Sequence, residues 1–521
     1  MKSKFSRLIS FTVIGMLALS SVLTGCTQKT DVPEASDPAA TKQDTLTVAF
    51  GSDPPTLDPH SSSSSPSVNA LNPIYETLVR YDENGEISPL LAESWEQIDE
   101  LSMKFNLRKG VKFHNGEEMK ASDVIYSMKR ATGPEGAKVS YIMKAIDSEK
   151  CEIVDDYTVI IRTHEPFAPL LGYLPYVGAV IVSEKEFTAD AAKAALNPVG
   201  TGPFKFVEWK KSDRVIYVRN DEYWGEKAAY TNLVIRTIVE ANSRVIELEA
   251  GGVDIIYDIP ANDVQRIEDN PDTKIEKKNS TIFEFLGMNT SKEPFNNVEF
   301  RRAIDLAIDE ESIVASVYRG NATYTPGPVT PNMKYFDDSD TKMRYNPEES
   351  KKILRELGIA EGTTYEVKLS ENKMRIDSAT IIQSMLKEVG INLEIKILEA
   401  GTFWDALEQG DSQFFISGWG AVGFPEPDNN IFGPLHSLQI PANNYCFYSN
   451  PEMDALLNAS RTTPDSPERE KIVKDVQKLI RSEVPYITYA NPQQIAGMRS
   501  NVMGFKPTPA ASHFVHKVYF E

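Results

Sequence analysis

The sequence of 521 residues predicts an α/β protein with mixed sheets. Segments in which apolar and polar residues alternate, as in strands, are interspersed irregularly with segments that have helical spacing. The order lacks the strict strand–helix repetition of a TIM barrel or a doubly wound parallel fold. Because one hydrophobic core rarely serves a chain of this length, we expect two or three domains.

The pattern of the N-terminal residues predicts a targeting segment. Met1–Arg7 is basic, Leu8–Leu23 carries no charge, and small residues follow. This pattern is typical of a secretory signal peptide, and the apolar stretch is short for a membrane-spanning helix. We therefore expect a signal peptide over residues 1–25. Thr27–Asp44 has hardly an apolar residue, so 26–44 is expected to be a flexible tether.

Regular elements follow from apolar spacing and from the residues that end each segment. Thr45–Phe50 alternates as a strand and meets Gly51 and Pro54, whereas the helical spacing of Asp377–Val389 stops at Gly390. The predicted strands are Thr45–Phe50, Ser102–Leu107, Thr158–Arg162, Arg214–Arg219, Leu233–Val239, Tyr365–Leu369 and Asn392–Ile397. The predicted helices are Ala121–Arg130, Ser243–Ala250, Val298–Ile308, Ile313–Tyr318, Pro347–Leu357 and Asp377–Val389. We expect Ser122 or Asp123 to cap the first of these helices.

Composition disfavours several classes of function. The net charge of −20 argues against a nucleic acid or an anionic membrane surface as the partner. With 6 His, and with neither an HExxH nor a CxxC motif, no metal site and no cofactor are expected. No Gly-x-Ser-x-Gly motif occurs, so we expect a protein without catalytic residues rather than an enzyme. The sequence leaves open whether Cys151 and Cys446 form a disulfide.

One tryptophan has an unusual setting. Phe414–Ser417 is a predicted strand that ends in Gly418-Trp419-Gly420. Flanking glycines remove neighbouring side chains and allow close backbone approach, and a strand end is a common ligand position. The planar indole of Trp419 can cover a peptide unit or a sugar face. The alternative is a tryptophan packed in the core.

Leu23-Thr24-Gly25-Cys26 resembles the lipobox of bacterial lipoproteins. The resemblance implies cleavage before Cys26, acylation of that cysteine and a chain anchored by lipid to the outer face of the cell membrane. The alternative is an ordinary signal peptide with a cysteine at this position by chance.

Four groups of motifs together resemble the large extracellular solute-binding proteins of ABC importers, the dipeptide- and oligopeptide-binding family. They occur in the family's order and span essentially the whole mature chain. The motifs are Leu90–Trp95 with Phe105–Gly116 and Ala121–Ser127; Pro198–Phe204 with Tyr223-Trp224; Pro294-Phe295 with Arg301–Ala303 and Ala307–Asp309; and Gly418–Ala421 with Pro427–Asn429 and Tyr448–Pro451.

This resemblance implies a two-lobe clamp like that of periplasmic binding proteins, which encloses its ligand between the lobes. Lobe 1 would hold residues 45–283 and 490–521, with 75–182 as an added subdomain, and lobe 2 would hold 284–489. The implied function is capture of an oligopeptide or dipeptide and delivery to a membrane-embedded ABC permease with its ATPase, by a protein expected to be a monomer. The same fold could instead serve an oligosaccharide, an opine-like conjugate or a chelated metal, or could sense a peptide signal.

The resemblance also implies a set of ligand-binding residues. In peptide-binding relatives the tryptophan borders the ligand, and an acid three positions later pairs with the ligand's amine; here that position is Val422. Either another acid such as Glu426 or Asp428 replaces it, or the ligand has no amine there. Arg375 precedes a predicted helix, where relatives place groups that bind a peptide's carboxylate or side chains. The alternative is that Arg375 is a solvated arginine on the surface. The expected ligand-binding residues are Arg375, Gly418, Trp419, Gly420, Ala421, Val422 and Asp428.

Overall fold

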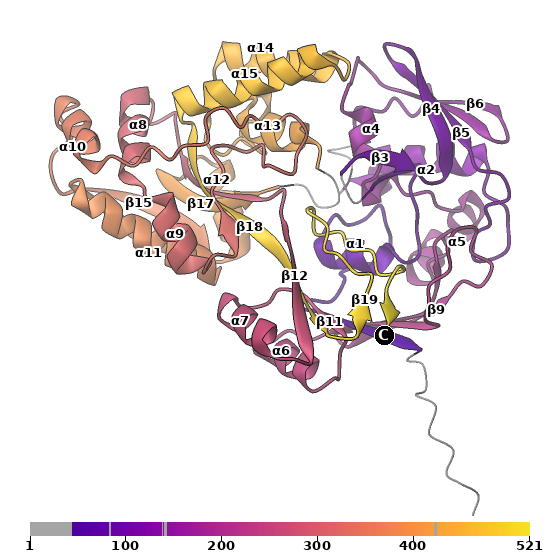
Figure 1. Ribbon diagram of the computed structural model, residues 1–521. Coiled ribbons are helices and arrows are strands. Elements are labelled where there is room, and N and C mark those ends of the chain that lie inside the picture. The colour runs from indigo at the N-terminus through magenta and orange to yellow at the C-terminus, as the bar shows by residue number, and fades with distance from the viewer. Residues whose placement is uncertain (1–43, 83–84, 138, 140–142, 421–424) are drawn as a thin grey trace, which may run out of the picture. The chain divides into compact units, whose positions relative to one another are not determined.

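The computed structural model describes residues 44–82, 85–137, 139, 143–420 and 425–521, which form one compact unit (Figure 1). Twelve of its strands belong to one sheet. They are β1 (Thr45–Phe50), β8 (Phe204–Lys210), β9 (Arg214–Arg219), β10 (Asn232–Thr237), β11 (Ile255–Ile256), β12 (Thr273–Asn279), β13 (Phe283–Met288), β14 (Ala322–Thr323), β15 (Thr363–Ser370), β16 (Ile391–Leu398), β17 (Phe414–Trp419) and β18 (Tyr486–Arg499). The main path runs β16-β15-β17-β13-β18-β11-β1-β10-β9-β8, while β12 and β14 also pair with β18. Parallel pairs such as β1 with β10 occur beside antiparallel pairs such as β9 with β10, which confirms the predicted mixed α/β class.

The remaining strands form three smaller sheets among the described residues. An antiparallel sheet with the order β4-β5-β7-β6 lies within residues 92–162, and the pairs β2-β3 and β19-β20 are separate. These strands are β2 (Val79–Tyr81), β3 (Ile87–Pro89), β4 (Ala92–Asp99), β5 (Ser102–Leu107), β6 (Glu152–Asp155), β7 (Thr158–Arg162), β19 (Val502–Met503) and β20 (Tyr519–Phe520).

Helices cover the sheets. In the first half of the chain they are α1 (Ser65–Leu71), α2 (Ala121–Thr132), α4 (Leu170–Tyr173), α5 (Glu184–Leu196), α6 (Ala241–Glu249) and α7 (Ala261–Asp269). Later in the chain they are α8 (Val298–Ala307), α9 (Glu310–Val317), α10 (Pro347–Glu356), α11 (Lys373–Glu388), α12 (Ala400–Glu408), α13 (Pro427–Leu435), α14 (Pro451–Thr462) and α15 (Pro467–Glu483). The described residues also contain three short 3-10 helices, Pro134–Gly136, Val177–Ala179 and Ser437–Gln439.

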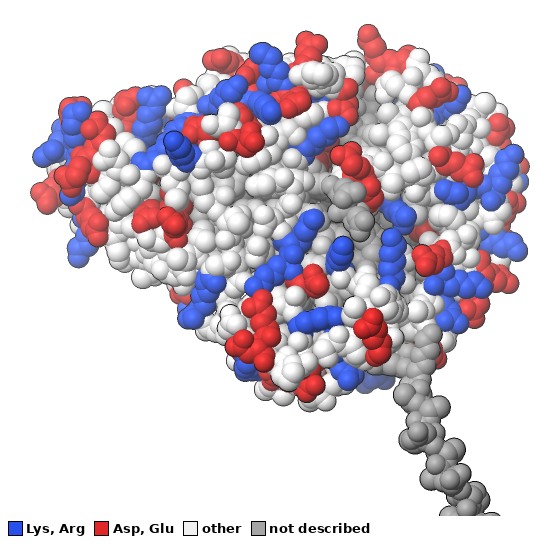
Figure 2. Space-filling model, in the orientation of Figure 1, with Lys and Arg blue, Asp and Glu red and all other residues white. Residues whose placement is uncertain are grey.

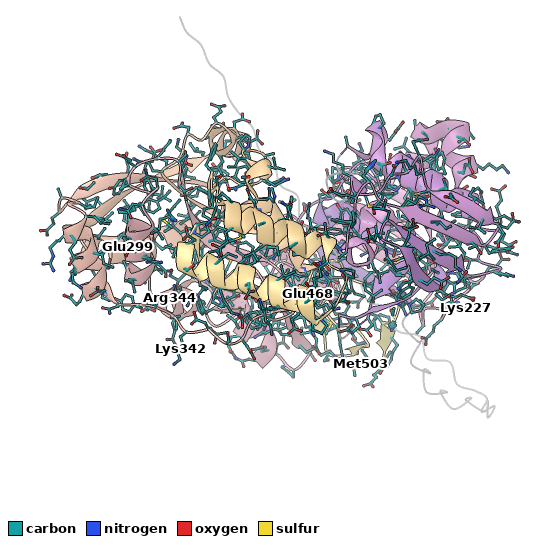
Figure 3. All side chains as sticks on the ribbon, turned by 90° about the horizontal axis from the view of Figure 1, so that it is seen from above. Lys227, Glu299, Lys342, Arg344, Glu468 and Met503 are labelled. Carbon is teal, nitrogen blue, oxygen red and sulfur yellow. The ribbon has the colours of Figure 1, made fainter. Side chains whose placement is uncertain are left out.

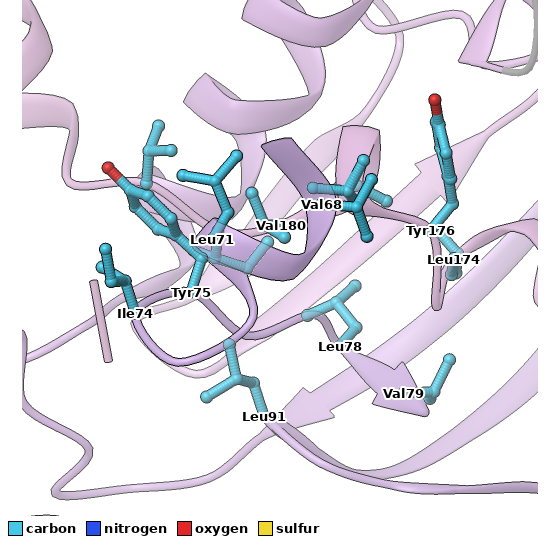
Figure 4. Packing of buried hydrophobic residues seen from close by; sticks show 14 of the residues in the cluster. Val68, Leu71, Ile74, Tyr75, Leu78, Val79, Leu91, Leu174, Tyr176 and Val180 are labelled. Atoms are coloured by element: carbon cyan, nitrogen blue, oxygen red, sulfur yellow. The ribbon is translucent and has the colours of Figure 1, made fainter. Parts of the chain in front are cut away.

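Hydrophobic side chains gather in separate cores, and we name the two lobes after them. The first lobe comprises the elements whose buried residues lie between Leu46 and Ile267 and between Ala496 and Val518. Figure 4 shows part of its core, in which α1 packs its apolar residues against the segments that carry Tyr75 and Val180. The second lobe comprises the elements whose buried residues lie between Phe283 and Ala490.

Strand β13 shows why the second lobe has two cores. All six of its residues are buried, because helices cover both faces of the sheet. Its side chains alternate, so that Leu286 and Met288 face the core formed with α8 and α11, whereas Phe283 and Phe285 face the core formed with α12, α14 and α15. A side chain at Gly287 would collide with the Phe415 ring of the neighbouring strand, so close packing requires glycine there.

Long strands connect the lobes. The first half of β18 pairs with β13 in the second lobe, and its second half pairs with β12 and β11 in the first lobe. The chain passes from β12 to β13 through residues 280–282, beside the part of β18 that leaves the second lobe. In Figure 1, β12 and β18 accordingly extend between the indigo and the orange elements. The lobes are thus joined by a few extended segments, a geometry that suits a hinge.

Two local expectations need correction. The N-cap residue of α2 is Lys120 rather than Ser122 or Asp123; Asp123 instead accepts a hydrogen bond from the backbone N–H of Lys120, at 2.9 Å. Helix α11 begins at Lys373, four residues before the predicted start, because Asn372 caps it by accepting from the N–H of Arg375. Arg375 therefore lies in the first turn of the helix and not before it.

Candidate functional site: a cavity between the lobes

A cavity of about 1580 Å³ lies between the two lobes. The first lobe contributes the β2–β3 hairpin, the segment 166–172 and the C-terminal segment 504–517; the second contributes 331–334, 425–426 and residues of 462–469. Ligand pockets of proteins usually measure about 300–1000 Å³. This cavity therefore has room for a solute larger than an ordinary small metabolite. Over the surface seen in Figure 2, charges of both signs are interspersed.

A hydrogen-bonded contact connects the lobes beside the cavity. Tyr173 of the first lobe donates its hydroxyl to Asp428 Oδ2 of the second, at 2.6 Å. Asp428 is only 1% exposed and also accepts from the Arg461 guanidinium at 2.7 and 2.8 Å. The backbone N–H of Ala168 donates to the Arg461 carbonyl at 2.6 Å. Burial, together with the Asp428 charge, raises the pKa of Tyr173 well above its usual value, so the hydroxyl remains a donor. We call Tyr173, Asp428 and Arg461 the inter-lobe triad.

Helices α14 and α15 supply the cations of this contact. Arg461 lies at the end of α14, and its guanidinium carbon lies 3.1 Å from the centroid of the Phe432 ring. Arg469, in the first half of α15, donates to Glu426 Oε1 at 2.9 Å, and both side chains are buried. Burial raises the pKa of Glu426, and Arg469 opposes that shift. Figure 3 shows the Glu468 end of α15 next to the first lobe, with Arg344 near the other end.

Trp419 lies at the end of β17, as expected, and is half-buried. Its indole N–H donates to the carbonyl of Asn429 at 2.9 Å, and the ring contacts Gly433. A side chain at Gly420 would collide with Ile282, so this glycine permits close packing of backbone. The described residues that line the cavity do not include Gly418, Trp419 or Gly420. Their contact with a ligand stays a prediction.

Arg375 binds a carboxylate of the protein itself. Its Nε donates to Glu284 Oε2 at 2.8 Å and its Nη2 to Glu284 Oε1 at 3.0 Å, a bidentate pair shielded from solvent. Burial lowers the pKa of Arg375, but the Glu284 charge raises it above the ordinary value, so the guanidinium stays charged. A side chain at Gly418 would collide with both charged groups, so that glycine makes room for the pair. Binding of a ligand carboxylate by Arg375 likewise stays a prediction.

Three predicted functional residues, Cys26, Ala421 and Val422, lie outside the described residues. Asp428 is described, and its contacts are those of the inter-lobe triad. Cys151 and Cys446 both have free thiols.

A buried carboxylate on the first-lobe wall was not anticipated. Glu76 accepts hydrogen bonds from Thr201 Oγ1 at 2.8 Å, Tyr223 OH at 2.7 Å and Trp224 Nε1 at 2.9 Å. Burial raises the pKa of Glu76, and these three donors oppose the rise. The Pro198–Phe204 and Tyr223-Trp224 motifs thus meet at one acid, and Glu76 and Tyr223 also line the cavity.

Sequence reasoning did not anticipate Glu76 and Arg469, which line the cavity. It also did not anticipate the contacts made by Tyr173, Glu284 and Arg461. Each has a partner far away along the chain; Tyr173 and Asp428 are 255 positions apart, and Glu284 and Arg375 are 91 apart. No spacing rule connects such pairs.

The described residues contain no group of three or more His, Cys, Asp or Glu side chains that could hold a metal ion. None of the helices within the described ranges is long and apolar enough to span a membrane.

Comparison with known proteins agrees with this geometry. Residues 86–440 match the family described as "Bacterial extracellular solute-binding proteins, family 5 Middle". The glutathione-binding protein GsiB of Pectobacterium atrosepticum is 30% identical over 477 residues, which are 89% of this chain and 91% of that protein. Heme-binding protein A of Haemophilus influenzae is 28% identical over 84% of this chain and 85% of its own length.

A solved structure gives the same result for the fold. The ABC transporter-associated periplasmic binding protein DppA from Helicobacter pylori, in complex with the peptide STSA, superimposes with a TM-score of 0.79 and 29% identity. The match covers 92% of this chain and 98% of that one. This similarity confirms the predicted two-lobe class of periplasmic binding proteins. The chain belongs to the bacterial extracellular solute-binding proteins, family 5.

Proposed function

We propose that this protein captures a peptide between its lobes and delivers it to an ABC permease that is driven by its ATPase. The peptide is either a dipeptide or a longer oligopeptide. The observation that carries the proposal is the cavity of about 1580 Å³, whose walls come from both lobes. A site built in this way binds its solute fully only when the lobes are together, so solute favours the closed form. The relatives named for glutathione and for a bound peptide support a peptide as the solute.

We also propose how the chain is anchored and divided into lobes. The chain works as a monomer on the outer face of the cell membrane, held there by acyl chains on Cys26 after removal of residues 1–25. Residues 26–44 act as the tether. Lobe 1 is formed by 45–283 and 490–521, with 75–182 as its added subdomain, and lobe 2 by 284–489.

The charges beside the cavity bear on the kind of peptide. Asp428 is paired with Arg461, and Glu426 with Arg469. Removing either acid from its arginine to bind a ligand ammonium would leave a buried charge without a partner, which costs several kcal/mol. These pairs favour a solute without a free amine at this point: a peptide that extends past it, a blocked peptide or a non-peptide solute. The relative named for heme keeps the last alternative open.

Mass spectrometry of the solute released from the purified protein tests the proposal. The protein is isolated without refolding, washed and denatured, and the released small molecules are fragmented. We expect peptides in roughly equimolar amount. Release of a single non-peptide compound at that amount would contradict the peptide assignment while leaving the solute-binding function intact.

A further inference from the structure

Several cations that line the cavity are already paired within the protein. Arg469 is paired with Glu426, Lys334 with Asp465, and Lys277 with Glu268. Arg80, Lys278 and Lys517 differ, since among the described residues none of these side chains has an ion pair or a hydrogen bond; Lys278 lies on β12. Arg80 follows Val79 in β2 and is half-buried, whereas Lys517 is exposed.

Arg80 and Lys517 act on the same part of the cavity wall. His516, which also lines the cavity, interacts electrostatically with both of them. Burial, and then these two positive charges, lower the pKa of His516 to about 4, so its imidazole is neutral near pH 7. Arg80 of β2 and Lys517 of the C-terminal segment therefore form one cationic region beside the neutral His516.

One carboxylate of the protein in this region, Glu76, is already occupied. Glu76 attracts Arg80, but its two oxygens accept from Thr201, Tyr223 and Trp224. The Arg80 guanidinium thus keeps its donors for another group. When the lobes close over the cavity and exclude water, an unpaired guanidinium costs free energy, and a carboxylate from the solute removes that cost through two parallel hydrogen bonds.

We infer that Arg80, with Lys517 at the cavity edge and His516 beside them, binds a carboxylate of the enclosed solute. The inference rests on the proposed peptide function and deepens it, because it selects peptides that place a C-terminal or an acidic side-chain carboxylate against the first lobe. Binding of the solute carboxylate thus falls to Arg80 and not to Arg375, because Arg375 already forms an ion pair with Glu284.

Two mixtures of random tri- to hexapeptides, one with free C-termini and one with C-terminal amides, are suitable probes. The protein is stripped of bound solute by unfolding and refolding, incubated with each mixture and washed, and the retained peptides are quantified by mass spectrometry. Wild type is compared with Arg80→Gln, with Arg80→Lys, and with Lys227→Gln, which removes one exposed positive charge of the first lobe outside the cavity. Melting curves confirm that each variant is folded.

We expect wild type and Lys227→Gln to prefer a carboxylate by about tenfold or more, as for a hydrogen bond between charged groups. Preference for free C-termini identifies the C-terminal carboxylate; enrichment of Asp- or Glu-containing peptides in the amide mixture identifies a side chain. Arg80→Gln should lose the preference, and Arg80→Lys should keep part of it. Equal retention of both mixtures without acidic enrichment, or an unchanged preference in Arg80→Gln, would overturn the inference alone. Retention of neither mixture would contradict the peptide function and the inference with it.

Discussion

Replacing Tyr173 by phenylalanine should weaken the contact between the lobes without disturbing either core. The variant keeps the ring, which stacks on Phe167 with centroids 5.6 Å apart, and loses the hydroxyl that donates to Asp428 at 2.6 Å. Asp428 stays neutralised, because Arg461 still donates to both of its oxygens. The loss is therefore that of one hydrogen bond to a charged acceptor, about 1.5–3 kcal/mol.

This free energy acts on the equilibrium between closed and open forms, because the bond exists only when the lobes are together. A loss of about 1.5–3 kcal/mol lowers the ratio of closed to open protein roughly ten- to hundredfold. If the solute-free protein is mostly open, the apparent Kd rises by the same factor, since only the closed fraction binds tightly. Calorimetric titration with the released solute measures this change.

Tyr217→Phe is the matched control. The Tyr217 hydroxyl is buried and donates to the carbonyl of Ala70 at 2.8 Å, so this bond lies entirely within the first lobe. We expect it to lower the free energy of unfolding by about 1 kcal/mol and to leave the affinity unchanged. An equal affinity for wild type, Tyr173→Phe and Tyr217→Phe would refute the role of the triad in closure.

Three further predictions concern stability and anchoring. Arg375→Gln leaves the buried Glu284 carboxylate without its partner, so urea titration should show a loss of about 3–5 kcal/mol in unfolding free energy; a loss below about 1 kcal/mol would contradict a buried pair. Burial lowers the pKa of His513 to about 3, below the ordinary value of 6.5. As the pH falls, the unfolded chain therefore protonates His513 at a higher pH than the folded protein does. The free energy of unfolding that comes from this group is complete above pH 6.5, and it falls by up to about 1.4 kcal/mol per pH unit below that value. His513→Phe should reduce this slope in melting curves from pH 7 to 4, and an unchanged slope would count against a neutral buried imidazole. Cys26→Ser should abolish incorporation of a lipid label, and equal labelling of wild type and variant would exclude acylation of Cys26.

Local patterns in the sequence predicted much of the secondary structure. Ser102–Leu107 and Thr158–Arg162 were predicted with the bounds of β5 and β7, because their side chains alternate between a core and the opposite face. Helix starts were less accurate where a cap precedes the apolar spacing. Asn372 begins α11 before the first residue of that spacing.

The site depended on information that no local pattern carries. The strand ending at Trp419 could be predicted, but its position relative to the cavity follows from the packing of β17 beside β13. The pairing of Arg375 with Glu284 brings an α11 side chain to strand β13, and Tyr173 reaches Asp428 only because the two lobes meet. Such contacts are set by the tertiary fold, and family resemblance identified the kind of site without identifying them.

Closure of the two lobes around a solute changes the size of the molecule, which small-angle X-ray scattering measures. Protein that has been stripped of solute by unfolding and refolding is measured before and after the solute mixture released from the native protein is restored at saturation. We expect a smaller radius of gyration after addition, because bound solute shifts an open population to the closed form. Superimposable scattering curves, with binding confirmed in the same sample, would contradict it.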